Sequence, residues 1–190
     1  MRAPLSFFCA AAALTIAAAA GVTEALAEPA GPELQAVAAK CSAPADLTRL
    51  QLPLKRTAQH IAGGQPLTVV AIGSSSTFGA GASSPERSYP SRLAVELKAL
   101  FPRMPITVIN HGVNGEESKD MLARFDHDVF GEKPDLVLWQ VGSNSVLRDR
   151  PLAEANASLR AGLKRLHDAG VDVVLINPQY APKVITKHDV

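Results

Sequence analysis

Four short runs of aliphatic residues, separated by stretches with helical spacing, constrain this 190-residue chain more than any other feature. The runs are Leu67–Ile72, Ile106–Ile109, Leu136–Trp139 and Val171–Ile176. Strands that read as continuous apolar runs are covered on both faces, as in a parallel sheet with helices on each side. The sequence therefore predicts an α/β fold, a three-layer α/β/α sandwich around a parallel, flavodoxin-like sheet.

Helical patterns fill the spaces between these runs. Three helices are predicted, one beginning near Pro90, one around residues 121–125 and one over residues 152–168. Gly170 stands at the C-terminal cap position of the third helix, where a left-handed conformation is common. Earlier in the chain we expect short helices at residues 33–40 and 55–61. After the fourth strand we expect a polar tail and no further helix.

Residues 1–27 have the pattern of a secretory signal peptide. Arg2 precedes an apolar run over residues 5–20, and Ala25-Leu26-Ala27 offers the small residues that a signal peptidase reads. A membrane anchor is the alternative, but the run is short for a bilayer and no basic cluster follows it. We expect cleavage after Ala27 and a secreted or periplasmic protein, in which residues 28–66 lead into a domain over residues 67–190.

Charge and cysteine content exclude several classes of protein. Lys and Arg number 19 against 18 Asp and Glu, so the chain lacks the basic surplus of a nucleic-acid binder. Cleavage of the leader would remove Cys9 and leave Cys41 alone, as a small buried residue, a free thiol, part of an intermolecular bridge or half of a pair whose partner is absent. The sequence shows no metal-ligand spacing and no dinucleotide fingerprint, so neither a metal nor another cofactor is expected.

Three loops rich in small and polar residues follow the first three predicted strands. They are residues 73–79, 110–115 and 142–144. Because the carboxyl ends of parallel strands meet at one edge of a sheet, we expect these loops to lie together. Ser75 would offer a hydroxyl there, Gly115 a backbone N–H and Asn144 a side-chain amide. An attacking group beside several hydrogen-bond donors is what acyl transfer requires.

The order of these loops resembles the SGNH (GDSL-type) hydrolases over roughly residues 67–176. The first block of that family reads Gly-Asp-Ser-x-Thr-x-Gly, and residues 73–79 match it with Ser74 in place of Asp. Residues 108–115 resemble the second block. Residues 142–145 resemble the third, Gly-x-Asn-Asp, with Ser145 in place of Asp. Tyr89-Pro90, at the start of the next predicted helix, also looks like the family.

The resemblance implies an esterase or lipase-like enzyme that cleaves carboxylic ester bonds. By this comparison Ser75 is the nucleophile, and its own N–H, the N–H of Gly115 and the side chain of Asn144 bind the oxyanion. The resemblance implies a small-molecule, glycan or lipid ester as substrate and no cofactor. From the charge balance we expect no nucleic-acid partner, and after leader cleavage we expect no stable membrane anchor.

One block of the family is absent from the sequence. The family carries its catalytic Asp and His near the C-terminus as Asp-x-x-His, and none of the five histidines here follows an acidic residue at that spacing. His188-Asp189 has the wrong order. We interpret the chain as an SGNH domain cut short at its C-terminus, which exposes an apolar sheet edge and leaves Ser75 a weak nucleophile.

Two other histidines stand near charged or loop residues. His111 is expected to be a loop residue without a catalytic role, and His127, between two aspartates, is expected on a solvated surface. Two other functions also stay open. The chain could be a non-catalytic SGNH-like binder of acylated glycans or lipids. A flavodoxin-like protein that holds phosphate or FMN on its first loop is the further alternative.

Overall fold

The structure is a computed structural model that describes residues 49–177 and 182–186. The predicted signal peptide, the predicted helix at residues 33–40 and Cys41 lie outside the described residues. Within the described ranges, no helix is both long enough and apolar enough to cross a membrane.

Four parallel strands form the sheet, in the order β2-β1-β3-β4. They are β1 (Leu67–Gly73), β2 (Ile106–Gly112), β3 (Leu136–Gln140) and β4 (Asp172–Ile176). Nearly every residue of the central strands β1 and β3 is buried, as their unbroken apolar runs predict. On the edge strand β4 no residue is fully buried, and Leu175 is 42% exposed.

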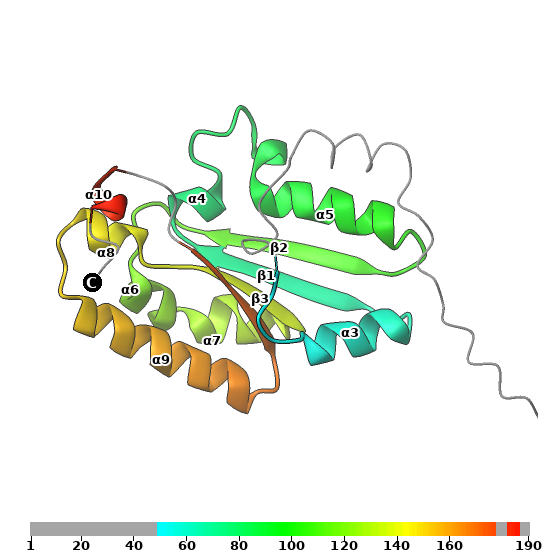
Figure 1. Cartoon of the computed structure of the whole chain (residues 1–190). Coiled ribbons are helices and arrows are strands. Elements are labelled where there is room, and N and C mark those ends of the chain that lie inside the picture. The colour runs from blue at the N-terminus through cyan, green and yellow to red at the C-terminus, as the bar shows by residue number, and fades with distance from the viewer. Residues whose placement is uncertain (1–48, 178–181, 187–190) are drawn as a thin grey trace, which may run out of the picture.

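Helices cover both faces of this sheet, which confirms the three-layer prediction (Figure 1). On one face, Leu93 and Leu97 of α5 pack against an apolar cluster formed by β1, β2 and β3. On the other, α6, α7 and α9 surround the buried ring of Trp139. The elements, with two short 3₁₀ turns η1 and η2, are α3 (Lys55–Ala62), α4 (Ser75–Phe78), η1 (Pro85–Arg87), α5 (Tyr89–Leu100), α6 (Ser118–Ala123), α7 (Phe125–Asp128), η2 (Phe130–Glu132), α8 (Ser143–Leu147), α9 (Leu152–Asp168) and α10 (Pro182–Ile185).

Some predicted boundaries are confirmed, and others differ from the structure. The bounds of α9 are those predicted, and Gly170 after it has a φ of +67°. Strand β2 does not stop at Ile109 but continues to Gly112, because it stays paired with β1 as far as Gly73. The single helix expected near residues 121–125 is two helices that meet at Arg124. The expected polar tail contains α10.

Helix α3 is held to the sheet by two aspartates at the end opposite the predicted loops (Figure 1). The buried carboxylate of Asp135 accepts hydrogen bonds from Arg56 Nε at 2.8 Å and from the N–H of Thr68 at 2.9 Å. Asp172 Oδ2 accepts from the N–H of Thr57 at 2.8 Å, so a strand residue caps the first turn of the helix. The segment before β1 is thereby fixed to the domain.

Close contact between α9 and the sheet depends on Gly162. A β-carbon on Gly162 would lie 2.4 Å from Trp139 Cη2. The indole is fully buried, and its Nε1–H points at Met121 Sδ, 3.2 Å away. The ring therefore has no room to withdraw, and α9 can approach the sheet only where its side chain is a hydrogen atom.

We expect Gly162→Ala to lower the free energy of unfolding by about 1–3 kcal/mol, because the added methyl group overlaps the indole. This is opposite in sign to the gain of about 1 kcal/mol that Gly→Ala gives inside an exposed helix. Urea denaturation of the wild type and variant measures the change.

The matched control is the same substitution in a Trp139→Phe background. The smaller ring makes room, so the cost of Gly162→Ala should shrink there, and the two changes should be coupled in a double-mutant cycle. Equal or greater stability of Gly162→Ala alone would contradict the packing account.

Candidate active site

The three predicted loops lie at one end of the sheet, where α4, α8 and the start of α6 gather (Figure 1). Ser75 is the first residue of α4, immediately after the end of β1 at Gly73 and the buried Ser74. Ser75 is half-buried, and neither its N–H nor its hydroxyl makes a hydrogen bond within the described part of the chain. As far as the described residues extend, both groups are free to act on a ligand.

The glycine and threonine of the first block pack against each other. A β-carbon on Gly73 would lie 2.1 Å from Thr77 Oγ1, so a larger residue at position 73 would displace the threonine. Thr77 is fully buried, and its hydroxyl shares a 3.1 Å hydrogen bond with the hydroxyl of Tyr89 at the start of α5. Burial raises the pKa of Tyr89, with the hydrogen bond to Thr77 acting in the opposite direction. The first block therefore fixes α4 between β1 and α5.

The end of β2 packs directly against α4. A β-carbon on Gly112 would lie 2.0 Å from the backbone nitrogen of Phe78, so α4 rests directly on the backbone of β2. Asn110 Nδ2 donates to the carbonyl of Thr77 at 2.9 Å, and Asn110 Oδ1 accepts from the N–H of Gly112 at 2.9 Å. These contacts give Asn110 and Gly112 a structural purpose that their position in the sequence did not reveal.

Gln140, the last residue of β3, connects the first loop to the third. The N–H and the hydroxyl of Ser74 both donate to Gln140 Oε1, at 3.0 and 2.9 Å. Gln140 Nε2 in turn donates to Ser143 Oγ at 3.3 Å. The serine that stands in place of the family's Asp is thus bound in a buried network, and sequence patterns gave no signal for this glutamine.

The second and third loops are joined by hydrogen bonds from Asn144 in α8 and from Arg148, which follows this helix. Asn144 Nδ2 donates to the carbonyl of Glu116 at 2.8 Å, which leaves its second amide hydrogen available. Arg148 Nη1 donates to the carbonyl of Gly115 at 2.8 Å. Gly115 has a φ of +80°, and among the described residues nothing accepts its N–H. The N–H of Val113 bonds to the Gly73 carbonyl at 3.0 Å, which joins the second loop to the first.

A buried glutamate, Glu117, lies next to the second and third loops. Glu117 caps α6 in a reciprocal capping box with Asp120, and its side chain is only 8% exposed. Its Oε1 accepts from Arg148 Nη1 at 2.9 Å and from Arg150 Nε at 3.3 Å. The hydrogen bond from Arg148 is the largest of the effects that hold the pKa of Glu117 below its ordinary value of 4.5. Sequence analysis missed Glu117 and both arginines.

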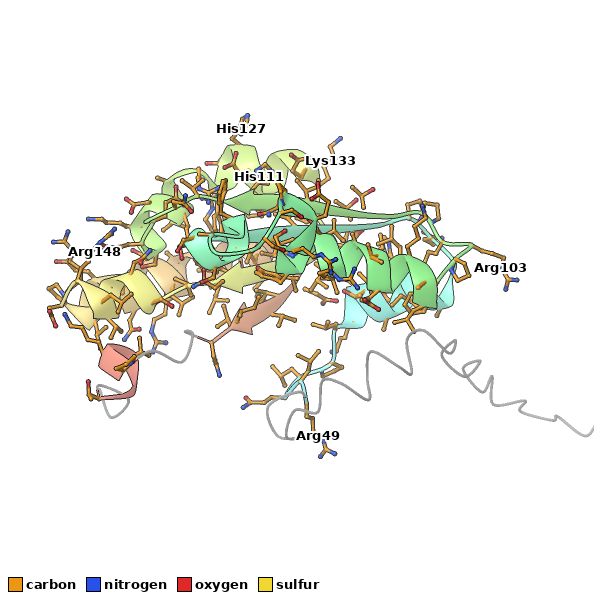
Figure 2. The ribbon with its side chains drawn as sticks, turned by 90° about the horizontal axis from the view of Figure 1, so that it is seen from above. Arg49, Arg103, His111, His127, Lys133 and Arg148 are labelled. Carbon is orange, nitrogen blue, oxygen red and sulfur yellow. The ribbon has the colours of Figure 1, made fainter. Side chains whose placement is uncertain are left out.

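The histidines near the site form hydrogen bonds with acidic side chains and not with Ser75. His111 lies in β2 rather than in a loop, and its Nε2 is 3.1 Å from Glu132 Oε1. The prediction of a loop residue was therefore wrong. His127 lies on the surface as predicted, 92% exposed, on the same side of the molecule as His111 (Figure 2). Its hydrogen bond to Asp128 raises the pKa of His127.

Two groups that active sites often contain, a histidine bonded to the serine and a metal-binding cluster, are absent from residues 49–177 and 182–186. In these ranges no histidine hydrogen-bonds to Ser75. They also contain no cluster of three metal-ligating side chains.

This parallel sheet, with its three joined loops at the carboxyl ends of the strands, is the fold of the SGNH/GDSL-type hydrolases. A protein described as lipolytic and of the G-D-S-L family, from Desulfitobacterium hafniense, superimposes with a TM-score of 0.55 at 28% identity, over 64% of this chain and 66% of that one. The chain belongs to the non-GDSL lipase-like family, whose model matches residues 40–190.

Two relatives of known sequence match parts of the chain. An acetylxylan esterase from Geobacillus stearothermophilus is 33% identical over 94 residues, which are 44% of this chain and 43% of the relative. An arylesterase from Vibrio mimicus is 32% identical over 97 residues, 51% of this chain and 48% of the relative. The match therefore spans less than half the length of each relative.

We expect Glu117→Gln to lower the free energy of unfolding at pH 7 by about 1–3 kcal/mol, because hydrogen bonds from two guanidinium groups lose their charged acceptor. The pKa of Glu117 in the folded chain lies below 4.5, so the carboxylate stabilises the fold above that pH. This contribution is lost as the pH falls through the folded-state pKa. Urea titrations from pH 7 downward should show the wild type and variant converging.

The matched control is Glu154→Gln, which changes an exposed glutamate on α9 and should leave stability nearly unchanged at every pH. A gap between the wild type and Glu117→Gln that stays constant as the pH falls would contradict the role of the Glu117 carboxylate.

Proposed function

We propose that this chain forms the nucleophile and the oxyanion-binding part of a serine ester hydrolase. The observation that carries the proposal is the pairwise connection of the three loops that bear Ser75, Gly115 and Asn144. Each of these residues retains at least one hydrogen-bond donor without a partner among the described residues. Groups of this kind at the rim of a parallel sheet suit the binding of a developing negative charge.

In the proposed reaction Ser75 Oγ attacks the carbonyl carbon of an ester. The C=O bond opens to an oxyanion that accepts hydrogen bonds from the N–H of Ser75, the N–H of Gly115 and Asn144 Nδ2. Collapse of this tetrahedral intermediate expels the alcohol, which takes up the proton lost by Ser75, and leaves an acyl-serine that water hydrolyses. A general base must carry that proton, and the proposal assigns this role to none of the described histidines.

We propose small acyl esters as the substrate class, on glycans or on aromatic alcohols. The support is the names of the two relatives, an acetylxylan esterase and an arylesterase. The exposed rings and methyl groups of Phe78 and Val113, close in sequence to Ser75 and Gly115, offer apolar surface at the rim. Export of the chain remains a proposal that rests on residues 1–27.

A second candidate is a binder that holds acylated glycans or lipids without cleaving them. The observation that favours it is the engagement of His60, His111 and His127 with partners other than Ser75. The two candidates differ in the reactivity of the serine, because a nucleophile must be more reactive than an ordinary surface hydroxyl.

The test is covalent labelling of the full chain with an alkyl fluorophosphonate, with imidazole added as an external base. Attack by Ser75 Oγ forms a serine–phosphorus bond and releases fluoride, and the phosphonyl oxygen takes the place of the oxyanion. We expect peptide mass spectrometry to find the label on Ser75 and none there in Ser75→Ala. Asn144→Ala should slow labelling about 10²-fold, the usual cost of one oxyanion donor.

Two internal controls make the labelling result specific. The exposed Ser83 reports the reactivity of an ordinary hydroxyl, and Asn156→Ala removes an exposed asparagine of α9 and should not affect the rate. Labelling of Ser75 no faster than Ser83 would reject the hydrolase and favour the binder.

A further inference from the structure

Asn144 of α8 and Arg148, the residue that follows α8, contact three consecutive residues at the end of the second loop and the start of α6. The carbonyl of Gly115 accepts from Arg148 Nη1 at 2.8 Å, and the carbonyl of Glu116 accepts from Asn144 Nδ2 at 2.8 Å. The carboxylate of Glu117 accepts from the same Arg148 Nη1 at 2.9 Å. A proposed oxyanion donor, Asn144, therefore lies in α8, and the residue just after this helix, Arg148, contacts the backbone of another proposed donor, Gly115.

The position of Arg148 allows its side chain to restrain this loop. It follows the last residue of α8, and its N–H bonds to the carbonyl of Asn144 at 3.0 Å, so backbone contacts link the two residues. Its side chain is 45% exposed, but the buried carboxylate of Glu117 anchors the guanidinium. Figure 2 shows Arg148 at the α8 end of the molecule, opposite the end where Arg103 lies.

A second guanidinium holds the other side of the same loop. Arg124 Nε donates to Glu116 Oε2 at 2.9 Å, and Arg124 Nη2 donates to the carbonyl of His111 at 2.7 Å. Arg124 is itself fixed by Asp128 through a 2.5 Å contact from Nη1. The loop between β2 and α6 therefore has charged anchors on both sides, and only the Arg148 anchor contacts Gly115.

The backbone of Gly115 is conformationally free, so a contact that restrains it matters at this residue. Its φ of +80° lies in the left-handed region, which glycine enters readily and also leaves readily. A β-carbon on Gly115 would lie 3.2 Å from Arg148 Nη2, so the guanidinium lies directly against this residue. The hydrogen bond from Arg148 restrains the Gly115 carbonyl, and the φ and ψ angles of Gly115 relate the direction of this carbonyl to that of its N–H.

We propose that Arg148 is a positioning residue for the oxyanion site. Its guanidinium, anchored by Glu117, fixes the Gly115 carbonyl and thereby holds the Gly115 N–H in the orientation that binds the oxyanion formed at Ser75. This inference rests on the proposed function, since it assigns Arg148 a role in the same site. Arg148 itself contacts neither the nucleophile nor the reacting atoms.

The chain offers a close control in Arg150. Arg150 also pairs with Glu117 Oε1, at 3.3 Å, and its side chain is 55% exposed, but the contacts of Gly115 do not include it. Arg148→Ala and Arg150→Ala therefore each remove one cation from the same carboxylate. Only Arg148→Ala also frees the Gly115 carbonyl.

The experiment measures fluorophosphonate labelling of Ser75 in the full chain with imidazole present, as a function of probe concentration. We expect Arg148→Ala to lower the maximal labelling rate at least about tenfold with little change in the half-saturating probe concentration, since a positioning residue affects the chemical step. Arg150→Ala should stay within about twofold of the wild type. Arg148→Lys should fall between, because an ammonium lacks the planar fork of a guanidinium.

Thermal unfolding of each variant sets a temperature at which all remain folded. Equal effects of Arg148→Ala and Arg150→Ala would overturn the inference, because loss of charge at Glu117 would then explain both. A change confined to the half-saturating concentration would also overturn it, since that result marks a substrate contact.

A second measurement separates this inference from the proposed function. The ¹⁵N order parameter of Gly115 should be near the rigid value of about 0.85 in the wild type and in Arg150→Ala, and should fall below about 0.6 in Arg148→Ala. Absence of label on wild-type Ser75 would reject the hydrolase, whereas an unchanged Gly115 order parameter in Arg148→Ala would reject the positioning role.

Discussion

The packing of α4 on two glycines is the constraint on which the rest of this site depends. Added β-carbons would lie 2.1 Å from Thr77 Oγ1 at Gly73 and 2.0 Å from the Phe78 nitrogen at Gly112. Both distances are far inside van der Waals contact, so any other residue at either position would push α4 away from the sheet. Because Ser75 begins α4, these two contacts decide where its hydroxyl lies relative to the other loops.

The remaining loops are placed by polar side chains rather than by apolar packing. Gln140 bridges Ser74 and Ser143, Asn144 reaches the Glu116 carbonyl and Arg148 joins Gly115 to Glu117. A neutral hydrogen bond contributes about 1 kcal/mol and one to a charged group about 1.5–3 kcal/mol, so such a network contributes to stability as well as to geometry. Its members also leave the donors of Ser75 and Gly115 without partners in the described part of the chain, which is what a site for a transient anion requires.

The sequence alone predicted a parallel, flavodoxin-like sheet covered by helices, the bounds of α9 and the end at which the three loops meet. These features follow from local signals, namely continuous apolar runs, a helical leucine stripe and the glycine at position 170. The contacts made by Gln140, Asn110 and Glu117 could not be predicted, because each joins residues that are distant in the chain and leaves no periodic pattern. The continuation of β2 was missed for the same reason, since pairing with β1 outweighs the turn-forming composition of Asn110-His111-Gly112.

The proposed site requires that the Ser75 hydroxyl and three hydrogen-bond donors, one from each loop, meet at a single point. A crystal structure of the chain phosphonylated on Ser75 tests it most directly, because the phosphonyl oxygen occupies the position of the oxyanion. The account predicts that this oxygen lies about 2.7–3.1 Å from the backbone nitrogens of Ser75 and Gly115 and from Asn144 Nδ2. A phosphonyl oxygen that points to solvent, with Gly115 or Asn144 beyond hydrogen-bond distance, would contradict it.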